Sequence, residues 1–164
     1  MAKKAVKKAG KKRVDLKEGD EAPDFLAMAT GGQEMSLSDF KGKNLVLYFY
    51  PKDDTPGCTK EACGFRDQFA EIKKRGAQIL GVSKDPAKSH KKFTDKFDLP
   101  FPLLSDEDHK IADAYGVWGE KKFMGRTYMG MHRVTFLIGG DGRIKKIWRT
   151  VKPDEHAAEV LAAF

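Results

Sequence analysis

The sequence predicts an α/β sandwich in which a central mixed β-sheet is flanked by helices. Residues 44–50 and 77–83 are short, almost continuous apolar runs that alternate with helical patterns. Residues 133–138 and 143–148 flank a glycine-rich turn, as the strands of a hairpin do, and the Ala-rich segment 154–164 has the composition of a helix. Strands that alternate with helices and then end in a hairpin form a sheet that helices cover.

Length and charge indicate one folded domain that follows a basic tail. The chain has 164 residues and a formal net charge of +7, from 31 basic and 24 acidic residues. Residues 1–14 carry seven Lys or Arg residues and no acid, which leaves 24 basic and 24 acidic residues in the remainder. We therefore predict a disordered tail at 1–14 and a formally neutral domain at 15–164.

The tail has several interpretations. A solubilising or incidental extension, a nuclear address and a weak contact with nucleic-acid phosphates all fit its lysines. No apolar run approaches the length of a membrane span, and no hydrophobic stretch follows the basic N-terminus as it would in a secretory signal. We expect a cytoplasmic monomer that makes no membrane contact.

The N-terminal part of the domain is predicted to enter as an extended segment and then form a small hairpin. Residues 25–28 and 34–37 flank Gly31 and Gly32, which favour a tight turn. Residues 38–43 form a turn into the first buried strand. That strand, 44–50, is almost unbroken in hydrophobicity, so it should be buried on both faces.

The carboxyl end of this strand leads into a segment that contains both cysteines. Thr55 and Pro56 form a helix-start signal, because Thr can cap free amides and Pro is tolerated at the first helical position. Cys58 then lies in the first turn, where free amides and the helix dipole favour a thiolate. The carboxyl ends of sheet strands are where α/β proteins place their chemistry.

Helical phase separates the two cysteines. The apolar residues of 59–75 mark a core-facing stripe, and Cys58 projects within roughly 10° of its centre, whereas Cys63 lies roughly 150° away. Cys63 should therefore point outward. Two plainer interpretations remain open: Cys63 as an incidental small residue, and Cys58 as a small residue at a buried helix start.

A disulfide between these cysteines requires the helix to open. Residues five apart on an α-helix have Cα atoms roughly 8.7 Å apart, beyond the span that a disulfide bridges. Gly57 and Gly64 flank the pair and lower the free-energy cost of unwinding.

The rest of the chain predicts further elements in order. Strand 77–83 precedes a helix that opens at Asp85-Pro86 and runs through Phe97, with a solvated lysine face. Residues 99–104 contain two prolines and form at best a short strand, and 108–115 form a helix. Residues 116–130 are expected to be loop-like. The large apolar residues there could pack near the cysteines, but core filling is the expected role for most of them; they are Trp118, Phe123, Met124, Tyr128, Met129 and nearby Met131.

Polar residues elsewhere offer two further candidates. The four histidines (His90, His109, His132 and His156) lack the spacing of metal ligands, so we expect no metal and place each at the surface or at a strand edge. Arg133 begins a buried strand, where a guanidinium needs an anionic partner. That partner could be the Cys58 thiolate or an acid, and an exposed strand-end Arg is equally compatible with the sequence.

Several motifs together resemble a known family. The pattern Pro51-x-x-x-Thr55-x-x-Cys58 resembles the active-site signature of peroxiredoxins, and the longer run YPKDDTPGCTKEACGFRD resembles their peroxiredoxin Q, or bacterioferritin comigratory protein, subfamily. The resemblance continues through 122–130 and 133–138 and covers about residues 16–164. It implies a thioredoxin-like α/β sandwich and no metal or organic cofactor.

The resemblance also implies a reaction, a thiol-dependent reduction of hydrogen peroxide or alkyl hydroperoxides in antioxidant defence. Cys58 would be the peroxidatic cysteine. Thr55, Arg133 and the amides of Gly57 and Cys58 would hold the peroxide, and Pro51 would shield the thiolate from water. Cys63 would resolve the sulfenic acid as a disulfide with Cys58, and thioredoxin would restore the thiols.

The chain departs from the commonest subfamily pattern at Asp54, which places an extra negative charge near the thiolate. Three rival functions remain. A thiol–disulfide oxidoreductase would normally show Cys-x-x-Cys, which is absent. A one-cysteine peroxidase would leave Cys63 idle, and a nucleic-acid-binding protein would rest on residues 1–14 alone.

Overall fold

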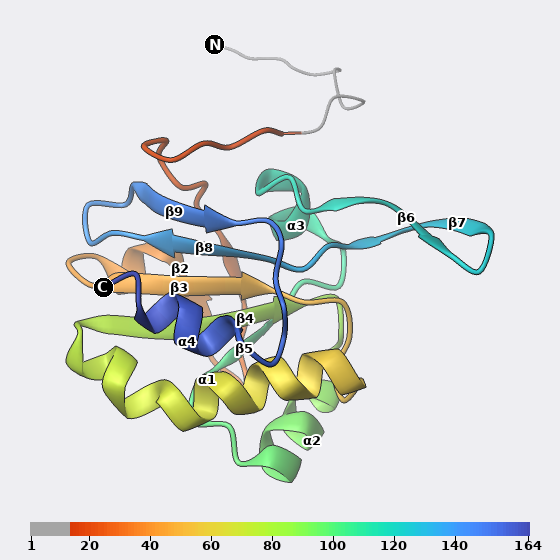
Figure 1. Cartoon of the computed structure of the whole chain (residues 1–164), viewed down its shortest axis with the longest axis horizontal. Helices are drawn as coiled ribbons and strands as arrows, with labels where there is room; N and C mark the ends of the chain where they lie inside the picture. The colour runs from red at the N-terminus through yellow and green to blue at the C-terminus, as the bar shows by residue number, and fades with distance from the viewer. Residues whose placement is uncertain (1–13) are drawn as a thin grey trace.

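The computed structural model describes residues 14–164, which form a five-stranded mixed sheet (Figure 1). Its strands, in spatial order, are β5 (Leu103–Ser105), β4 (Ala77–Ser83), β3 (Asn44–Phe49), β8 (Val134–Ile138) and β9 (Ile144–Trp148). β3 runs parallel to β4 and antiparallel to β8, and β8 and β9 form the predicted antiparallel hairpin. The mixed central sheet is therefore confirmed. The proposed tail 1–14 lies almost wholly outside the described residues.

Helices cover both faces of this sheet. They are α1 (Pro56–Lys74), α2 (Ala87–Phe97), α3 (Lys110–Ala114) and α4 (His156–Leu161). α3 and α4 are shorter than the segments predicted for them. Among the described residues, none of the helices has the length and apolar composition that crossing a membrane requires.

Strand β3 organises the core because its side chains alternate between two apolar clusters. Leu45, Leu47 and Phe49 pack on the side that α3 covers, with residues such as Ile111 and Phe136. Val46, Tyr48 and Tyr50 pack on the opposite side, with residues from α1, α2 and α4. The strand is buried on both faces, as predicted, since consecutive side chains point to opposite faces.

The N-terminal hairpin is also confirmed. β1 (Leu26–Met28) pairs with β2 (Glu34–Ser36) in antiparallel register, and a 3-10 turn, Leu37–Phe40, leads on towards β3. Gly31 and Gly32 in the connection both have positive φ, which glycine adopts without a Cβ clash.

The prediction of a loop at 116–130 is wrong. β6 (Trp118–Phe123) and β7 (Arg126–Met131) form an antiparallel hairpin that extends from the body, to the right in Figure 1. Its two-residue turn, Met124 and Gly125, has positive φ at both positions (51° and 79°). Such turns match the twist of paired strands, so local turn geometry forms this hairpin without a hydrophobic pattern.

The expectation that the large apolar residues of this segment fill the core is also wrong for most of them. Phe123, Met124, Tyr128 and Met129 are exposed, whereas Met131 is buried and Trp118 is half-buried. The hairpin leaves the body after its first residue pairs, so its distal side chains have no core to enter.

Two histidines likewise contradict the expectation of surface positions. His90 and His156 are fully buried. Nδ1 of His90 lies 2.7 Å from Asp53 and its Nε2 lies 2.8 Å from the Leu104 carbonyl, while Nε2 of His156 lies 2.7 Å from the Thr135 hydroxyl. Burial is tolerated because both ring nitrogens have partners.

Candidate active site

Cys58 lies where the sequence predicted, in the first turn of α1 just beyond the carboxyl end of β3. Pro56 occupies the first turn, and the thiol is 1% exposed within the cluster that includes Tyr48 and Phe65. A thiol at this place meets the free amides of the helix N-terminus and lies in a low-dielectric environment.

Arg133 is the predicted site residue that the fold brings into direct contact with Cys58. It precedes β8, the neighbour of β3, and its Nη2 donates a hydrogen bond to Cys58 Sγ over 3.4 Å. Its Nη1 lies 2.7 Å from Glu61 Oε1 in an ion pair. Burial lowers the pKa of Arg133, but the charges and hydrogen bonds of Cys58 and Glu61 together raise it by more. The pKa of Arg133 therefore lies above its ordinary value.

Glu61 is a site residue that the sequence analysis missed. It is fully buried one turn after Cys58, and residues three apart on a helix lie on the same face. Burial raises the pKa of Glu61 to about 7, although the charge and hydrogen bond of Arg133 lower it. Its Oε2 is buried and makes no hydrogen bond within the described part of the chain. The sequence did contain an indication of this burial, because Glu61 directly precedes Ala62 in the core-facing stripe of the helix.

Gly57 allows the guanidinium to approach the helix. A Cβ atom at Gly57 would lie 3.1 Å from Nη2 of Arg133, which is tighter than ordinary contacts. Any side chain here would press on the group that contacts Cys58. The close approach of Arg133 therefore favours a residue without a side chain at position 57.

Thr55 and Pro51 lie in the loop before the helix. Thr55 is the N-cap residue, but the expectation that its side chain caps the helix amides is wrong. Its hydroxyl instead donates to the Lys52 carbonyl over 2.9 Å, which fixes the loop and leaves the oxygen lone pairs available. Pro51 is half-buried at the end of β3.

Cys63 is half-buried and, like Cys58, is a free thiol. Both residues belong to the continuous helix α1, so helical geometry holds their Cα atoms roughly 8.7 Å apart. The next residue, Gly64, packs closely against α4. A Cβ atom at this position would lie 3.3 Å from the Cβ of Ala157.

Asp54, the departure from the subfamily pattern, forms an ion pair at the surface. Its Oδ2 lies 2.8 Å from Nζ of Lys96 in α2, and both side chains are about half exposed. The backbone φ of Asp54 is 56°, in the left-handed region. This conformation directs the chain into the N-cap of α1.

A buried polar cluster beside this loop contains the groups that could hold a metal. Ligand atoms of Asp53, Asp85 and His90 all lie within 4.8 Å of one another. Each is already engaged, since Asp53 Oδ2 contacts His90 and Ser89, and Asp85 Oδ2 accepts hydrogen bonds from Ser83 and the Asp53 amide. A cation would have to displace these bonds, so the cluster is better suited to holding the loop that precedes Thr55.

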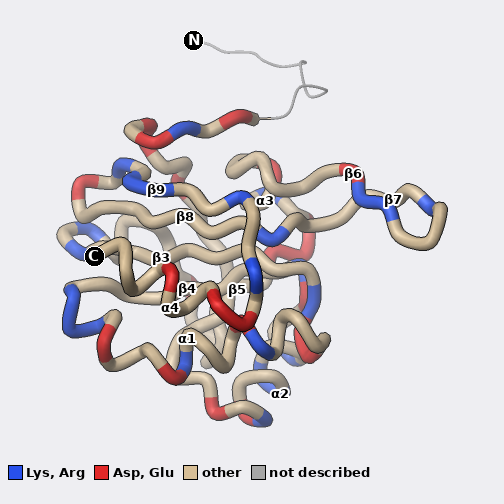
Figure 2. Tube along the Cα trace, in the orientation of Figure 1, with Lys and Arg blue, Asp and Glu red and all other residues tan. Residues whose placement is uncertain are grey.

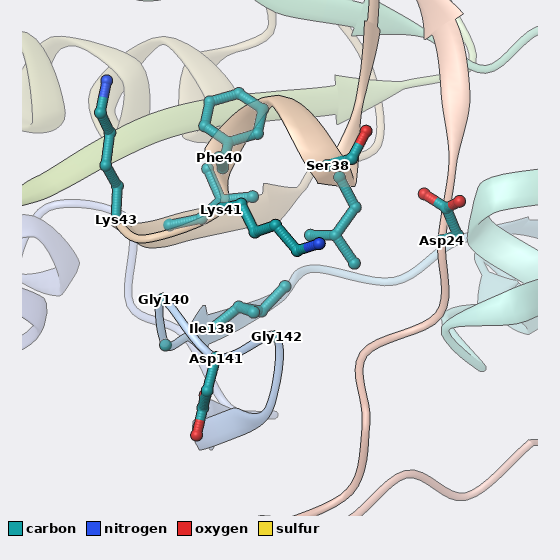
Figure 3. Close-up of a pocket in the computed structure, with 12 residues that line it drawn as sticks. Asp24, Ser38, Phe40, Lys41, Lys43, Ile138, Gly140, Asp141 and Gly142 are labelled. Atoms are coloured by element: carbon teal, nitrogen blue, oxygen red, sulfur yellow. The ribbon is translucent and has the colours of Figure 1, made fainter.

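A cavity with a mainly apolar lining lies away from the cysteines. It has a volume of about 220 Å³ and lies at the other end of β3, beside Leu45 and Ile138 (Figure 3). Phe40 and Lys41 also line it. Since β3 runs from Leu45 towards Cys58, the cavity and the thiol lie at opposite ends of the sheet.

Sequence comparison identifies the family. Residues 18–147 match the AhpC/TSA family. The chain is 48% identical to peroxiredoxin Bcp of Escherichia coli K12 over 146 residues, which are 89% of this chain and 94% of that protein. It is 52% identical to peroxiredoxin Bcp of Bacillus subtilis 168 over 143 residues, 87% of this chain and 91% of that protein.

Solved structures agree with this result. A structure of the Xanthomonas campestris bacterioferritin comigratory protein, described in terms of alkyl peroxide reduction activity, superposes with a TM-score of 0.81 at 43% identity, covering 85% of this chain and 88% of that one. The Xylella fastidiosa PrxQ superposes with a TM-score of 0.86 at 39% identity, covering 92% of this chain and 96% of that one. The predicted thioredoxin-like fold is thereby confirmed. The chain belongs to the AhpC/TSA family and, within it, to the Bcp/PrxQ peroxiredoxins, which makes it a peroxidase.

Proposed function

We propose that the chain reduces hydrogen peroxide and organic hydroperoxides through Cys58, with Cys63 as the resolving cysteine and thioredoxin as the reductant. The observation that carries the proposal is the buried Cys58 thiol in the first turn of α1, with the Arg133 guanidinium 3.4 Å from its sulfur. A cation and a helix N-terminus around one thiol favour the thiolate, which is the nucleophile.

In the first step the Cys58 thiolate attacks one peroxide oxygen. An S–O bond forms while the O–O bond breaks, so the sulfur is oxidised to a sulfenic acid and the peroxide is reduced. The leaving oxygen takes a proton and departs as water or an alcohol. Arg133 and the amides of Gly57 and Cys58 stabilise the charge that develops on these oxygens, and Thr55 accepts a hydrogen bond from the peroxide.

In the second step Cys63 attacks the sulfenic sulfur of Cys58, a disulfide forms and water leaves. The first turns of α1 must unwind, because the intact helix holds the two Cα atoms too far apart for a disulfide. A dithiol then returns two electrons and regenerates both thiols. Thioredoxin is proposed as this dithiol reductant because the family resemblance implies it.

A coupled assay tests the cycle as a whole. NADPH consumption is followed with thioredoxin, its reductase and either hydrogen peroxide or an alkyl hydroperoxide. The wild type should turn over, and Cys58→Ser should not. Turnover in the Cys63→Ser variant at the wild-type rate would favour a one-cysteine peroxidase instead.

For the basic residues 1–14 we propose a weak contact with nucleic acid that takes no part in the peroxidase reaction. Deletion of residues 1–14 should preserve turnover and remove salt-sensitive retention on DNA. If the whole chain shows no DNA binding at low salt, the phosphate-contact hypothesis fails. The monomeric state stays a prediction, which sedimentation of the reduced protein checks.

A further inference from the structure

The β6–β7 hairpin is an arm that stands apart from the rest of the fold. Its strands pair with each other in a separate two-stranded sheet, and neither joins the five-stranded sheet. Figure 1 shows the pair extending beyond the body. We call residues 118–131 the arm.

The distal half of the arm exposes large apolar side chains. Met124 at the turn is 87% exposed and Phe123 beside it is 65% exposed, and Tyr128 and Met129 are about half exposed. Four of the seven exposed large hydrophobic residues in the described part of the chain therefore lie within seven consecutive positions. Single exposed apolar residues need no explanation, whereas such a concentration indicates a contact surface.

Cations surround these apolar residues. Lys122 and Arg126 are exposed in the distal half of the arm, Lys121 beside them is half-buried, and residues 121–131 contain no acid. The one acid of the arm, Glu120, directly precedes Lys121 in β6, and Figure 2 shows Lys and Arg in the part of the arm beyond it. The register places Arg126 opposite Phe123 and Lys121 opposite Tyr128, so cations and aromatic rings share one face of the hairpin.

The base of the arm is fixed to the body. Trp118 stacks on His109 with ring centroids 4.1 Å apart, and Met131 is buried. Within the arm, Lys121 Nζ donates to the Met131 carbonyl over 3.0 Å, so this side chain extends back towards the base. Arg133, which donates to Cys58 Sγ, follows Met131 by two residues, so the base of the arm leads directly to the site. In agreement, burial and the charge of Arg133 lower the pKa of Lys121, whereas Cys58 raises it. The arm therefore has a defined orientation, and its base adjoins the Cys58 site.

The composition of the arm discriminates between occupants. The cores of protein interfaces are depleted in lysine, and two adjacent lysines next to the most exposed apolar residues do not fit that pattern. A second arm would meet this one with like charge. An anionic bilayer surface fits both features, since its hydrocarbon takes Phe and Met while Lys and Arg extend to the headgroups.

We propose that the arm docks on the surface of an anionic lipid bilayer, with Phe123 and Met124 inserted below the headgroups and the exposed cations Lys122 and Arg126 bound to lipid phosphates. The protein then lies on the membrane without spanning it, and this proposal replaces the expectation from the sequence that the protein makes no membrane contact. Because the base of the arm adjoins Arg133 and Cys58, docking holds the peroxidase site beside the membrane surface. This inference goes beyond the peroxidase activity and does not depend on it.

Vesicle co-sedimentation tests the proposal. The whole chain is mixed with vesicles of phosphatidylcholine alone or of phosphatidylcholine with phosphatidylglycerol. Binding should require the anionic lipid. The double variant Phe123→Ser/Met124→Ser should lower the partition constant more than tenfold. Lys122→Gln/Arg126→Gln should lower it about fivefold for each charge removed.

The matched control is Leu26→Ser/Met28→Ser, which removes two exposed apolar side chains of β1, far along the chain from the arm. It should bind as the wild type does. All of these variants keep the basic N-terminal residues, so a difference between them reports the arm alone. Wild-type binding by Phe123→Ser/Met124→Ser, or an equal loss in the control, overturns the proposal.

Fluorescence gives a second measurement that does not depend on weakened binding. The emission of Met124→Trp should shift to the blue on anionic vesicles, whereas Leu26→Trp should not shift. Equal shifts, or none at Met124→Trp, contradict insertion. If Phe123→Ser/Met124→Ser instead slows turnover with thioredoxin or dissociates a dimer, with vesicle binding unchanged, the arm contacts protein and the proposal is wrong.

Discussion

The guanidinium of Arg133 lies 3.4 Å from the sulfur of Cys58, and its other nitrogen is held 2.7 Å from buried Glu61. One planar group thus contacts both the thiol and an acid on the same helix face. Because the fork geometry fixes both contacts at once, Glu61 sets the direction in which Arg133 faces the thiol.

The first prediction concerns this fork. Arg133→Ala should slow peroxide oxidation of Cys58 by roughly tenfold to a thousandfold, because a donor for the developing charge is lost. Arg133→Lys keeps the charge but cannot make both contacts, and its rate should fall between the two. Stopped-flow fluorescence of the reduced proteins measures the rates, and equal rates in all three proteins would exclude the role of Arg133.

The second prediction concerns the pH dependence of stability. Burial raises the pKa of Glu61 from 4.5 to about 7, so between these values the folded protein keeps a proton that the unfolded chain releases. Stability from this group is fully present below about pH 4.5 and is lost as the pH rises through about 7.

Glu61→Gln removes this titration and keeps the shape. The free energy of unfolding of the wild type, measured relative to Glu61→Gln by urea denaturation of the reduced proteins, should therefore fall by a few kcal/mol between pH 5 and pH 8. A difference that stays constant or grows over this interval would show that Glu61 is not protonated as its burial implies.

The third prediction separates two uses of the Thr55 hydroxyl. It donates to the Lys52 carbonyl and caps no helix amide, so Thr55→Val should change stability by only about 1 kcal/mol. The same variant should slow Cys58 oxidation by at least roughly tenfold, since the peroxide loses an acceptor. Thr55→Ser is the control that keeps the hydroxyl. If Thr55→Val oxidises as fast as Thr55→Ser, the hydroxyl does not contact the peroxide.

Sequence patterns predicted the elements whose burial is strong and periodic. The sequence located the ends of four elements to within one or two residues: β3, β4, α1 and α2. Buried strands and amphipathic helices can be recognised from the spacing of their apolar residues. The β6–β7 hairpin was missed because solvent surrounds most of it. Its strands show no alternation, and its formation depends on the left-handed pair at Met124 and Gly125.

The sequence predicted those site residues that lie close together along the chain. Cys58 and Thr55 follow from the start of a helix after a buried strand. The Arg133–Glu61 pair joins residues 72 positions apart, and the Asp53–His90 contact joins residues 37 apart. Such pairs arise from the order of strands in the sheet, which no single segment of sequence encodes.

The fourth prediction concerns unwinding of α1. Replacement of Gly64 by Ala should stabilise the helix by about 1 kcal/mol, but the added methyl would press on Ala157 of α4. The double variant Gly64→Ala/Ala157→Gly relieves that contact. It should form the disulfide more slowly than the Ala157→Gly control and convert Cys58 to the sulfinic acid at lower peroxide concentration. Peptide mass spectrometry after graded peroxide treatment measures both, and identical behaviour would remove unwinding from the mechanism.

Mass spectrometry of the reduced protein after one equivalent of hydrogen peroxide tests the central claim most directly. The wild type should contain a Cys58–Cys63 disulfide, Cys63→Ser should carry a sulfenic acid on Cys58, and Cys58→Ser should keep Cys63 as a free thiol. Hydrogen exchange of the same samples should show faster exchange at the start of α1 in the oxidised wild type, with β3 still protected. Oxidation of Cys63 at the wild-type rate in Cys58→Ser, or no disulfide in the wild type, would contradict the account.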